Sequence, residues 1–549
     1  MPSTPFFHAD GVAALRIPAG APAGPGRDSL HMPTVTFIGH AGVAVDATAF
    51  HLLADPWLDP SGAFLGAWHQ YPRNDHLDVA ALLDADWVAV SHEHLDHFDP
   101  WVIDRLPART RILIPRYPGP AFRERMLAAA GGRQVIELTA WEKFPLDNRG
   151  SWITAIPELS PMCHDAAFLI VADGRGLLHC NDARLTAAQA RRAKHLAGGR
   201  LDLMALQTSG ASWHPICYEY PSAEMARVSM DKRVSKLRAA QRLVRQTAPE
   251  LAVPFAGPPC FLDAEVGHLN WVLDQRDGAF CDPDVSTAWL REHLPRQRWD
   301  YFKPGDTLDL DTGECTRDPV SAAFSFADSA EYLDRYAADR ASAIAEVVAT
   351  HPEPGPDLYE RFAAHFEYLG GLSDYFLRQI AMVVRFEVTG PNGGVWDVDF
   401  RPDGLTVSKA SPDVRPHYRI TAAGRWVNGI LAGRLAWEDL LISFRVSLYR
   451  DPDVYNDYLV GLLKHANAPA LMAVEAYETE RDESERITVE SGGVRYDIPR
   501  YCPHAGEDLS VGAVVRDGRI HCLAHNFAFD LSTGECVNAR AANLTSERC

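Results

Sequence analysis

Short apolar runs separated by turn residues characterise the first half of the chain. Residues 34–38 run into a Gly-His-Ala-Gly turn, and residues 87–90 form another short run that ends at a cluster of histidines. Two further runs, 167–171 and 177–179, lie on either side of an Asp-Gly pair, which predicts a β-hairpin. Helical stretches lie between and after these strands, so the pattern predicts one layered α/β domain over residues 31–320.

The second half of the chain has a different pattern. Residues 383–408 have the pattern of strand, turn and strand, whereas residues 421–450 look mostly helical and amphipathic. Pro and Gly gather at 352–356 and mark a linker, and a charged stretch at 478–485 precedes a C-terminal motif. The predicted division of the chain is an N-terminal segment (1–30), a large α/β domain (31–320), a helical connector (321–377), an α+β region (378–475) and a small C-terminal domain (476–549).

Composition and charge narrow the classes of function. The 549 residues are 47% hydrophobic and 23% charged, as in ordinary globular proteins, and the formal net charge is −20. A charge of this sign argues against non-specific binding to nucleic acid or to an anionic membrane surface. The first 31 residues lack a signal-peptide pattern, and no run of about 18 apolar residues occurs. We therefore expect a cytoplasmic protein that binds neither membrane nor nucleic acid.

The histidine cluster after residue 90 has the composition of a metal site. It places His92, His94, Asp96 and His97 within six residues of one another, directly after a predicted strand. Imidazoles and carboxylates together suit Zn, Fe or Mn, and their mixture fits a dinuclear site. The pattern resembles the signature of the metallo-β-lactamase fold, an αββα sandwich. The Gly-His-Ala-Gly turn and the run Asp55-Pro56-Trp57 are similar to the preceding strands of the lactonase-like branch of that fold.

The resemblance implies further metal ligands downstream. His164, just before a strand, stands where the fold supplies a third ligand to the first metal, with Glu158 as the competing candidate. Asp182 stands where a bridging carboxylate is expected, which would offset the repulsion between two cations. The last ligand stays open, because the histidine that the fold usually supplies is missing: His214, which is also the candidate catalytic residue, or His268 could take its place. Otherwise the position is open to oxygen or substrate.

A second motif lies near the C-terminus. Cys502-Pro-His504 and Cys522-Leu-Ala-His525 are separated by 522 − 504 − 1 = 17 residues. The two loops and the trailing Phe-Asp-Leu-Ser-Thr-Gly closely resemble a Rieske domain. In such a domain two thiolates hold one iron and two imidazoles hold the other iron of a [2Fe-2S] cluster. The alternative is a Cys₂His₂ zinc site, but its ligands typically occur as a Cys pair followed by a His pair.

Beyond these two motifs, much of the chain resembles the CMP-N-acetylneuraminate hydroxylase family. The similar runs include residues 181–184, 203–212, 254–257 and 449–455. One difference is the domain order, because that family carries its Rieske domain first and this chain carries it last. Residues 378–475 also resemble a sterol-carrier protein. The expected fold is therefore α/β: an αββα metallo-β-lactamase-like sandwich, a sterol-carrier-like α+β middle region and a small all-β Rieske domain.

The two motifs together predict an O2-dependent monooxygenase that hydroxylates or N-oxygenates a small polar substrate. The Rieske cluster would take electrons from an external NAD(P)H-dependent reductase or ferredoxin and relay them to two iron ions, with zinc as the alternative metal. A homo-oligomer would bring the centres together if the domains of one chain do not. The rival function is a dinuclear zinc hydrolase of lactones, esters or phosphodiesters with an accessory Rieske domain. A basic helix, Met225–Arg245, is either a solvated surface or a site for an anionic substrate or an acidic electron donor.

Overall fold

Two β-sheets packed face to face organise the first half of the protein. The computed structural model describes residues 33–549 except 161, 210–211 and 524–526. The first sheet has the strand order β16 (Cys315–Thr316), β15 (Thr307–Asp309), β1 (Thr34–Gly39), β2 (Gly42–Asp46), β3 (His51–Ala54), β5 (Trp87–Ala89), β6 (Arg111–Pro115) and β7 (Val135–Leu138). The second sheet has the order β13 (Leu251–Phe255), β12 (Leu203–Gln207), β11 (Arg175–His179), β10 (Ala166–Ala172), β9 (Trp152–Pro157) and β8 (Phe144–Pro145).

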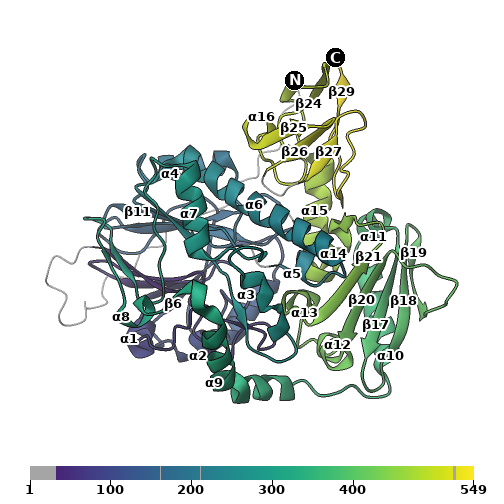
Figure 1. Ribbon diagram of the computed structural model, residues 1–549, viewed down its shortest axis with the longest axis horizontal. Helices are drawn as coiled ribbons and strands as arrows, with labels where there is room; N and C mark the ends of the chain where they lie inside the picture. The colour runs from purple at the N-terminus through teal and green to yellow at the C-terminus, as the bar shows by residue number, and fades with distance from the viewer. Residues whose placement is uncertain (1–32, 161, 210–211, 524–526) are drawn as a thin grey trace, which may run out of the picture.

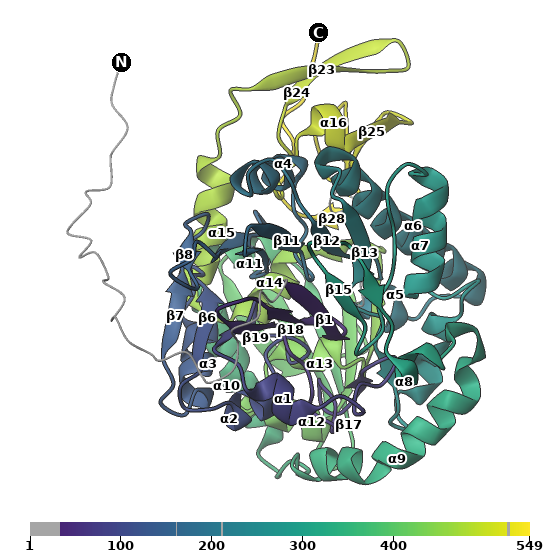
Figure 2. The same ribbon diagram turned by 90° about the vertical axis from the view of Figure 1, so that its left-hand side faces the viewer.

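Helices cover the outer face of each sheet. All seven residues of β10 are buried, because Phe168 and Ile170 face the other sheet while Ala167 and Leu169 face helices. Those helices are α4 (Ala187–Leu196), α6 (Ser222–Thr247) and α7 (Pro283–His293). The first sheet packs in the same way against α1 (Val79–Leu83), α2 (Pro100–Arg105) and α3 (Ala121–Ala129). The result is the predicted αββα sandwich, seen edge-on in Figure 2.

Local backbone geometry confirms the predicted hairpin. β10 and β11 pair antiparallel from Phe168↔His179 to Ala172↔Arg175. Asp173 and Gly174 turn the chain with φ angles of 48° and 82°, a region that Gly and Asp tolerate better than most residues.

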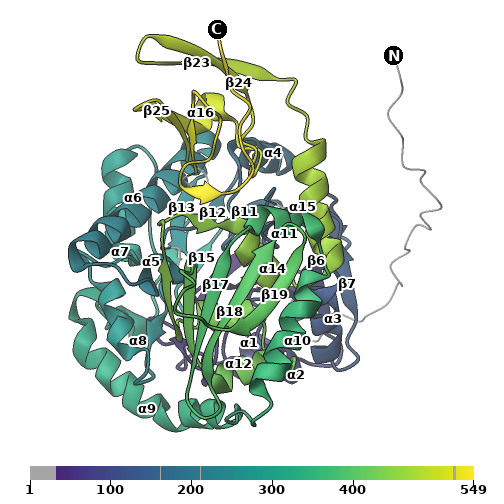
Figure 3. The ribbon, with the colours of Figure 1, turned by 90° about the vertical axis from the view of Figure 1, so that its right-hand side faces the viewer.

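The middle region is built on a five-stranded sheet. Its strand order is β19 (Gly404–Lys409), β18 (Gly394–Arg401), β17 (Val383–Thr389), β20 (Tyr418–Ala423) and β21 (Val446–Arg450), which face the viewer in Figure 3. The helices around it are α9 (Ser329–Ala349), α10 (Leu358–Gly370), α11 (Asp374–Ile380), α12 (Gly424–Leu431), α13 (Trp437–Ile442) and α14 (Asp457–His465). The expectation of a mostly helical stretch over 421–450 was wrong at both ends. Tyr418, Ile420 and Ala422 are buried in alternation, the period-two pattern of a strand.

The C-terminal unit is small and almost entirely β. Helix α15 (Ala468–Glu480) follows α14 and leads into this unit. In Figure 1 the unit lies at the top, above the other two regions. One of its sheets contains β23 (Arg486–Ser491), β24 (Val494–Pro499) and β29 (Glu547–Arg548), and the other contains β25 (Ala513–Arg516), β26 (Arg519–Cys522) and β27 (Ala528–Asp530). Ile498, Ile520 and Phe529 form its core together with the two motif cysteines. None of the helices in the described part of the chain is long and apolar enough to cross a membrane.

A buried ion pair joins the C-terminal unit to the sandwich. Arg242 of α6 donates to the carboxylate of Glu507, whose side chain is completely buried. A second connection is a two-residue parallel pairing of β22 (Tyr455–Asn456) with β28 (Ala539–Arg540). The placement of the C-terminal unit therefore depends on side chains and strands from both of the other regions.

We expect Arg242→Gln to loosen the C-terminal unit from α6. Removing one partner of a buried ion pair leaves an uncompensated charge, which typically destabilises by about 3–5 kcal/mol. Hydrogen–deuterium exchange of residues 486–549 should accelerate by about tenfold or more. Arg245→Gln, an exposed position on the same helix, is the control and should exchange as the wild type does. Equal protection in both variants would show that the pair does not hold the unit in place.

Candidate functional site

The histidine loop is fixed at both ends. It follows β5 and ends at Asp99, whose Oδ1 accepts from the backbone N–H groups of Trp101 and Val102 and caps α2. The other oxygen of Asp99 accepts from the N–H groups of Leu58 at 2.8 Å and Asp59 at 2.9 Å. This one carboxylate therefore satisfies donors of a helix and of a neighbouring loop, which holds the end of the histidine loop in place.

Asp55 fixes the start of the loop and one of its imidazoles. It follows β3 and accepts from the Ser91 backbone N–H at 2.7 Å and from the Ser91 hydroxyl at 2.8 Å. The same carboxylate lies 3.1 Å from Nδ1 of His97 and is completely buried. Since Nδ1 is bound to Asp55, Nε2 of His97 is free to point into the site. No site role was predicted for Asp55.

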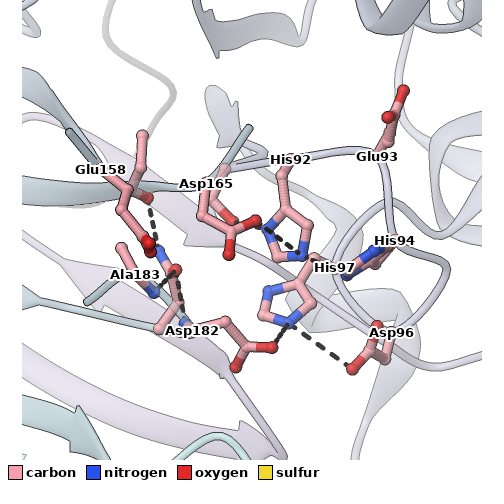
Figure 4. Close-up of polar contacts among 12 residues, drawn as sticks. His92, Glu93, His94, Asp96, His97, Glu158, Asp165, Asp182 and Ala183 are labelled. Atoms are coloured by element: carbon pink, nitrogen blue, oxygen red, sulfur yellow. Dashed lines mark hydrogen bonds and ion pairs between the residues drawn. The ribbon is translucent and has the colours of Figure 1, made fainter. Parts of the chain in front are cut away.

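One group of side chains gathers around His92. Its Nε2 lies 2.9 Å from Nδ1 of His94 and 3.7 Å from Oδ1 of Asp165. Two nitrogens this close suit the ligands of a single cation that each would bind at about 2.1 Å. Figure 4 shows these side chains converging, whereas Glu93 points away from them.

A second group lies beside the first and is centred on His97. Nε2 of His97 is 3.6 Å from Asp96 and 3.7 Å from Asp182, and both carboxylates point toward it in Figure 4. Nε2 of His40 lies 2.9 Å from the same Asp96 oxygen. The sets His40–Asp96–His97 and His92–His97–Asp182 could each hold a metal ion. His97 belongs to both sets, and Asp182 belongs to the set that contains His92.

The charges of this cluster suit bound cations. Burial would lower the pKa of His97, but the carboxylates of Asp96, Asp182 and Asp55 raise it well above its usual value. Burial also opposes ionisation of Asp182, yet the charge of His97 lowers the pKa of the Asp182 carboxyl below its usual range. Among the described residues, Nε2 of His97 and Oδ1 of Asp96 are buried without a hydrogen-bond partner. A metal ion would supply the missing partner to both atoms, so the residues present fit a dinuclear metal centre.

The middle region contributes a further layer around this cluster. Glu438 of α13 lies 3.1 Å from Nε2 of His94 and 2.8 Å from the ammonium of Lys464 on α14. Burial opposes the charged form of His94, but Glu438 raises its pKa to about 9. Because Glu438 engages Nε2, the other nitrogen of His94 faces His92. On the opposite side, the Gln207 amide donates to Asp182 at 2.7 Å and orients that carboxylate.

The structure brings Asp165, and not the predicted His164, to the cluster. The ring of His164 stacks on Tyr117, with centroids 5.2 Å apart, and contacts the ring of His465 at 4.4 Å. Neighbouring side chains of an extended segment point in opposite directions, so only one of the two residues before β10 can face His92. Glu158, the competing candidate, accepts instead from the backbone N–H of Arg184 at 2.9 Å.

The two histidines considered for the last position lie elsewhere. Nε2 of His214 is 3.1 Å from the Tyr220 hydroxyl, and His268 is exposed in the 3-10 helix η1 (Gly267–Leu273). His40, at the end of β1, is the histidine that contacts Asp96. The only sequence signal for it was the Gly-His-Ala-Gly turn, where His40 adopts a positive φ of 49°.

The C-terminal motif forms a second centre. Cys502 and Cys522 are buried, and the neighbouring Cys522 thiol together with burial raises the pKa of Cys502 well above its usual value. Two adjacent buried sulfurs fit one iron of an iron–sulfur cluster. His525 lies outside the described residues. Nε2 of His504 reaches 3.3 Å from the hydroxyl of Ser160, which follows β9, and 3.5 Å from a carboxylate oxygen of Asp457 on α14.

A cavity of about 600 Å³ lies between the two centres. Asp182 and Gln207 line it on the sandwich side, and His504 and Phe527 line it on the side of the C-terminal unit. His214 also lines this cavity, so it lies near the cluster without joining it. A volume of this size suits a small organic molecule.

Comparison with known proteins confirms the C-terminal prediction. Residues 473–546 match the Rieske [2Fe-2S] domain family. A protein of Mycobacterium tuberculosis described as a Rieske 2Fe-2S iron-sulfur protein is 30% identical over 538 residues, which cover 94% of this chain and 99% of the relative. The cytidine monophosphate-N-acetylneuraminic acid hydroxylase of Danio rerio is 23% identical over 446 residues, covering 77% of this chain and 70% of the relative.

Solved structures match about half of this chain. CmlA, a diiron beta-hydroxylase from Streptomyces venezuelae, is 15% identical over 53% of this chain and 55% of its own, with a TM-score of 0.34. At this TM-score the similarity decides nothing about activity.

Asp165→Asn and the neighbouring His164→Gln separate two assignments of the same ligand position. If Asp165 is the ligand, its variant should lose at least one of about two metal ions per chain, whereas His164→Gln should keep both. Metal analysis by mass spectrometry measures this, and the Rieske cluster absorbance checks that each variant is folded. Loss of metal only in His164→Gln would reverse the assignment.

Proposed function

The chain belongs to the family of Rieske 2Fe-2S iron-sulfur proteins that its full-length mycobacterial relative represents, and we propose that it is an O2-dependent monooxygenase. In this proposal the Rieske domain relays electrons to a non-heme diiron site in the metallo-β-lactamase-like sandwich. The substrate is a small polar molecule that is hydroxylated or N-oxygenated. The electrons come from an external NAD(P)H-dependent reductase or ferredoxin.

The observation that carries the proposal is the shared cavity. Asp182 of the dinuclear cluster and His504 of the Rieske unit line the same space within one chain. His504 also contacts Ser160 of the sandwich and Asp457 of α14. An electron carrier placed so close to a buried metal cluster is suited to supply it with electrons. This relay needs no second copy of the chain.

The side chains around the cavity define which residues would hold each group. Cys502, His504, Cys522 and His525 would hold the [2Fe-2S] cluster. His92, His94 and Asp165 would hold one iron and His40, Asp96 and His97 the other, with Asp182 between them. Three carboxylates in this set favour iron over zinc. The chemistry that the two irons supply when bound is the reductive activation of oxygen.

The remaining residues orient the ligands. Asp55 holds His97 through Nδ1, Glu438 holds His94 through Nε2, and Gln207 holds Asp182. Each of these partners is itself anchored: Asp55 by Ser91, Glu438 by Lys464. Such outer contacts fix the protonated nitrogen and the orientation of each ligand before the metal binds.

Metal and sulfide analysis of anaerobically purified protein tests the proposal. We expect about four irons and two acid-labile sulfides per chain, and a Rieske-type EPR signal after reduction with dithionite. About two irons together with about two zincs would contradict a diiron site and would favour hydrolysis of a lactone, ester or phosphodiester.

Cys502→Ser tests the electron relay directly. Without the [2Fe-2S] cluster, oxygen uptake supported by reduced ferredoxin should fall by about a hundredfold or more, because the cluster is the proposed carrier of electrons to the diiron site. The non-cluster metal ions should remain. Cys549→Ser, an exposed cysteine at the end of the same unit, is the matched control. Undiminished oxygen uptake in Cys502→Ser would end the relay hypothesis.

A further inference from the structure

Three basic side chains that line the cavity between the two centres form no ion pair with a described carboxylate. Four other basic residues on its wall have acidic partners: Arg227 with Asp231, Arg242 with Glu507, Arg450 with Asp453, and Lys464 with Glu438. Arg184, Lys232 and Lys236 also line the cavity. Within the described part of the chain, none of the three has a carboxylate at ion-pair distance.

Neutral oxygens fix the two lysines without cancelling their charge. The Lys232 ammonium donates to the Ser212 hydroxyl and to the backbone carbonyl of His214, both at 2.5 Å. The Lys236 ammonium donates to the side-chain oxygen of Gln207 at 2.5 Å. Both lysines lie one helical turn apart on α6, so their ammonium groups are presented side by side.

Arg184 completes the group from the other wall of the cavity. It follows β11 two residues after Asp182, and its side chain is exposed to the cavity. Its guanidinium makes no hydrogen bond to any described residue, so its donors are available to a ligand. Burial and the Arg184 charge lower the pKa of Lys236 to about 7, against the opposing effect of the more distant Asp182, Glu158 and Asp165. Burial, Lys236 and Arg184 hold the pKa of Lys232 well below its usual value, whereas Glu158 raises the pKa of Arg184 against the effect of burial.

Cations that share one cavity without ion-pair partners repel one another, and a bound anion relieves the repulsion. The group is also tied to the metal cluster, because Lys236 bonds to Gln207 and Gln207 bonds to Asp182. We propose that the cavity binds an anionic substrate whose phosphate or carboxylate group docks on Arg184, Lys232 and Lys236. The rest of the substrate would then lie between this group and the dinuclear cluster.

The statement that the anion is the substrate rests on the proposed function. The statement that the cavity binds an anion does not rest on it. Titration calorimetry of the purified holoprotein at low salt would use inorganic phosphate, pyrophosphate and malonate as probes. We expect at least one probe to bind once per chain, with an affinity that falls as salt is added. Tighter binding of pyrophosphate than of malonate would identify a phosphate site, and the reverse order a carboxylate site.

Substitutions at Arg184 locate the bound probe. Arg184→Gln should weaken its binding by about tenfold or more, and Arg184→Lys should recover most of the loss because it restores the charge. Arg238→Gln, on the exposed face of α6, is the matched control and should bind as the wild type does. Rieske absorbance and metal content of each variant show that it is folded and loaded.

Two outcomes would overturn the inference. The first is that no probe binds to the wild type, and the second is that Arg184→Gln binds as tightly as the wild type, which would place the anion on the metals alone. Neither outcome depends on whether the cluster holds iron or zinc. Failure of the anion site and failure of the oxygenase proposal are therefore separable.

Discussion

The buried carboxylate of Asp55 is the contact on which the candidate metal cluster depends. Asp55 follows β3, the histidine loop follows β5, and these two strands are parallel neighbours, so both segments leave the sheet at the same edge. Its bonds to Ser91 set the start of the loop, and its contact with His97 directs the other nitrogen of that ring toward Asp96 and Asp182. A short loop could present its imidazoles in many ways, and this carboxylate selects one of them.

The middle region contributes side chains that contact residues of both candidate centres. Its helices α13 and α14 supply Glu438 and Lys464 to the His94 side of the cluster and Asp457 to the contact of His504. Asp457 and Lys464, two turns apart on α14, therefore contact residues of two different candidate metal centres. Because these contacts are ionic and buried, a shift of α14 would disturb both centres together.

Sequence patterns predicted the parts of the site that are close together along the chain. The His92–His97 loop and the Cys-x-His and Cys-x-x-His pairs were recognisable because their spacing is local. His40 and Asp165 were not assigned to the site: the Gly-His-Ala-Gly turn marked the position of His40 without indicating a role for its side chain, and a lone aspartate before a strand has no local signal. The choice between His164 and Asp165 depends on which side of an extended segment faces His92, and the sequence leaves that side undetermined. Predicting 421–450 as helical failed for a related reason, since strand and helix patterns adjoin within it.

The position of the Rieske domain at the end of the chain is compatible with the hydroxylase-like resemblance, in which that domain comes first. The proposed relay depends on the position of His504 in space. Contacts with segments far away in sequence set that position: His504 contacts Ser160 and Asp457, and the Arg242–Glu507 pair joins the same unit to the sandwich. None of these contacts requires a particular order of domains along the chain. A Rieske unit attached at either end could make them, provided that its connecting segment reached the same face of the sandwich. Domain order can therefore change in such proteins while the cavity between the two centres is retained.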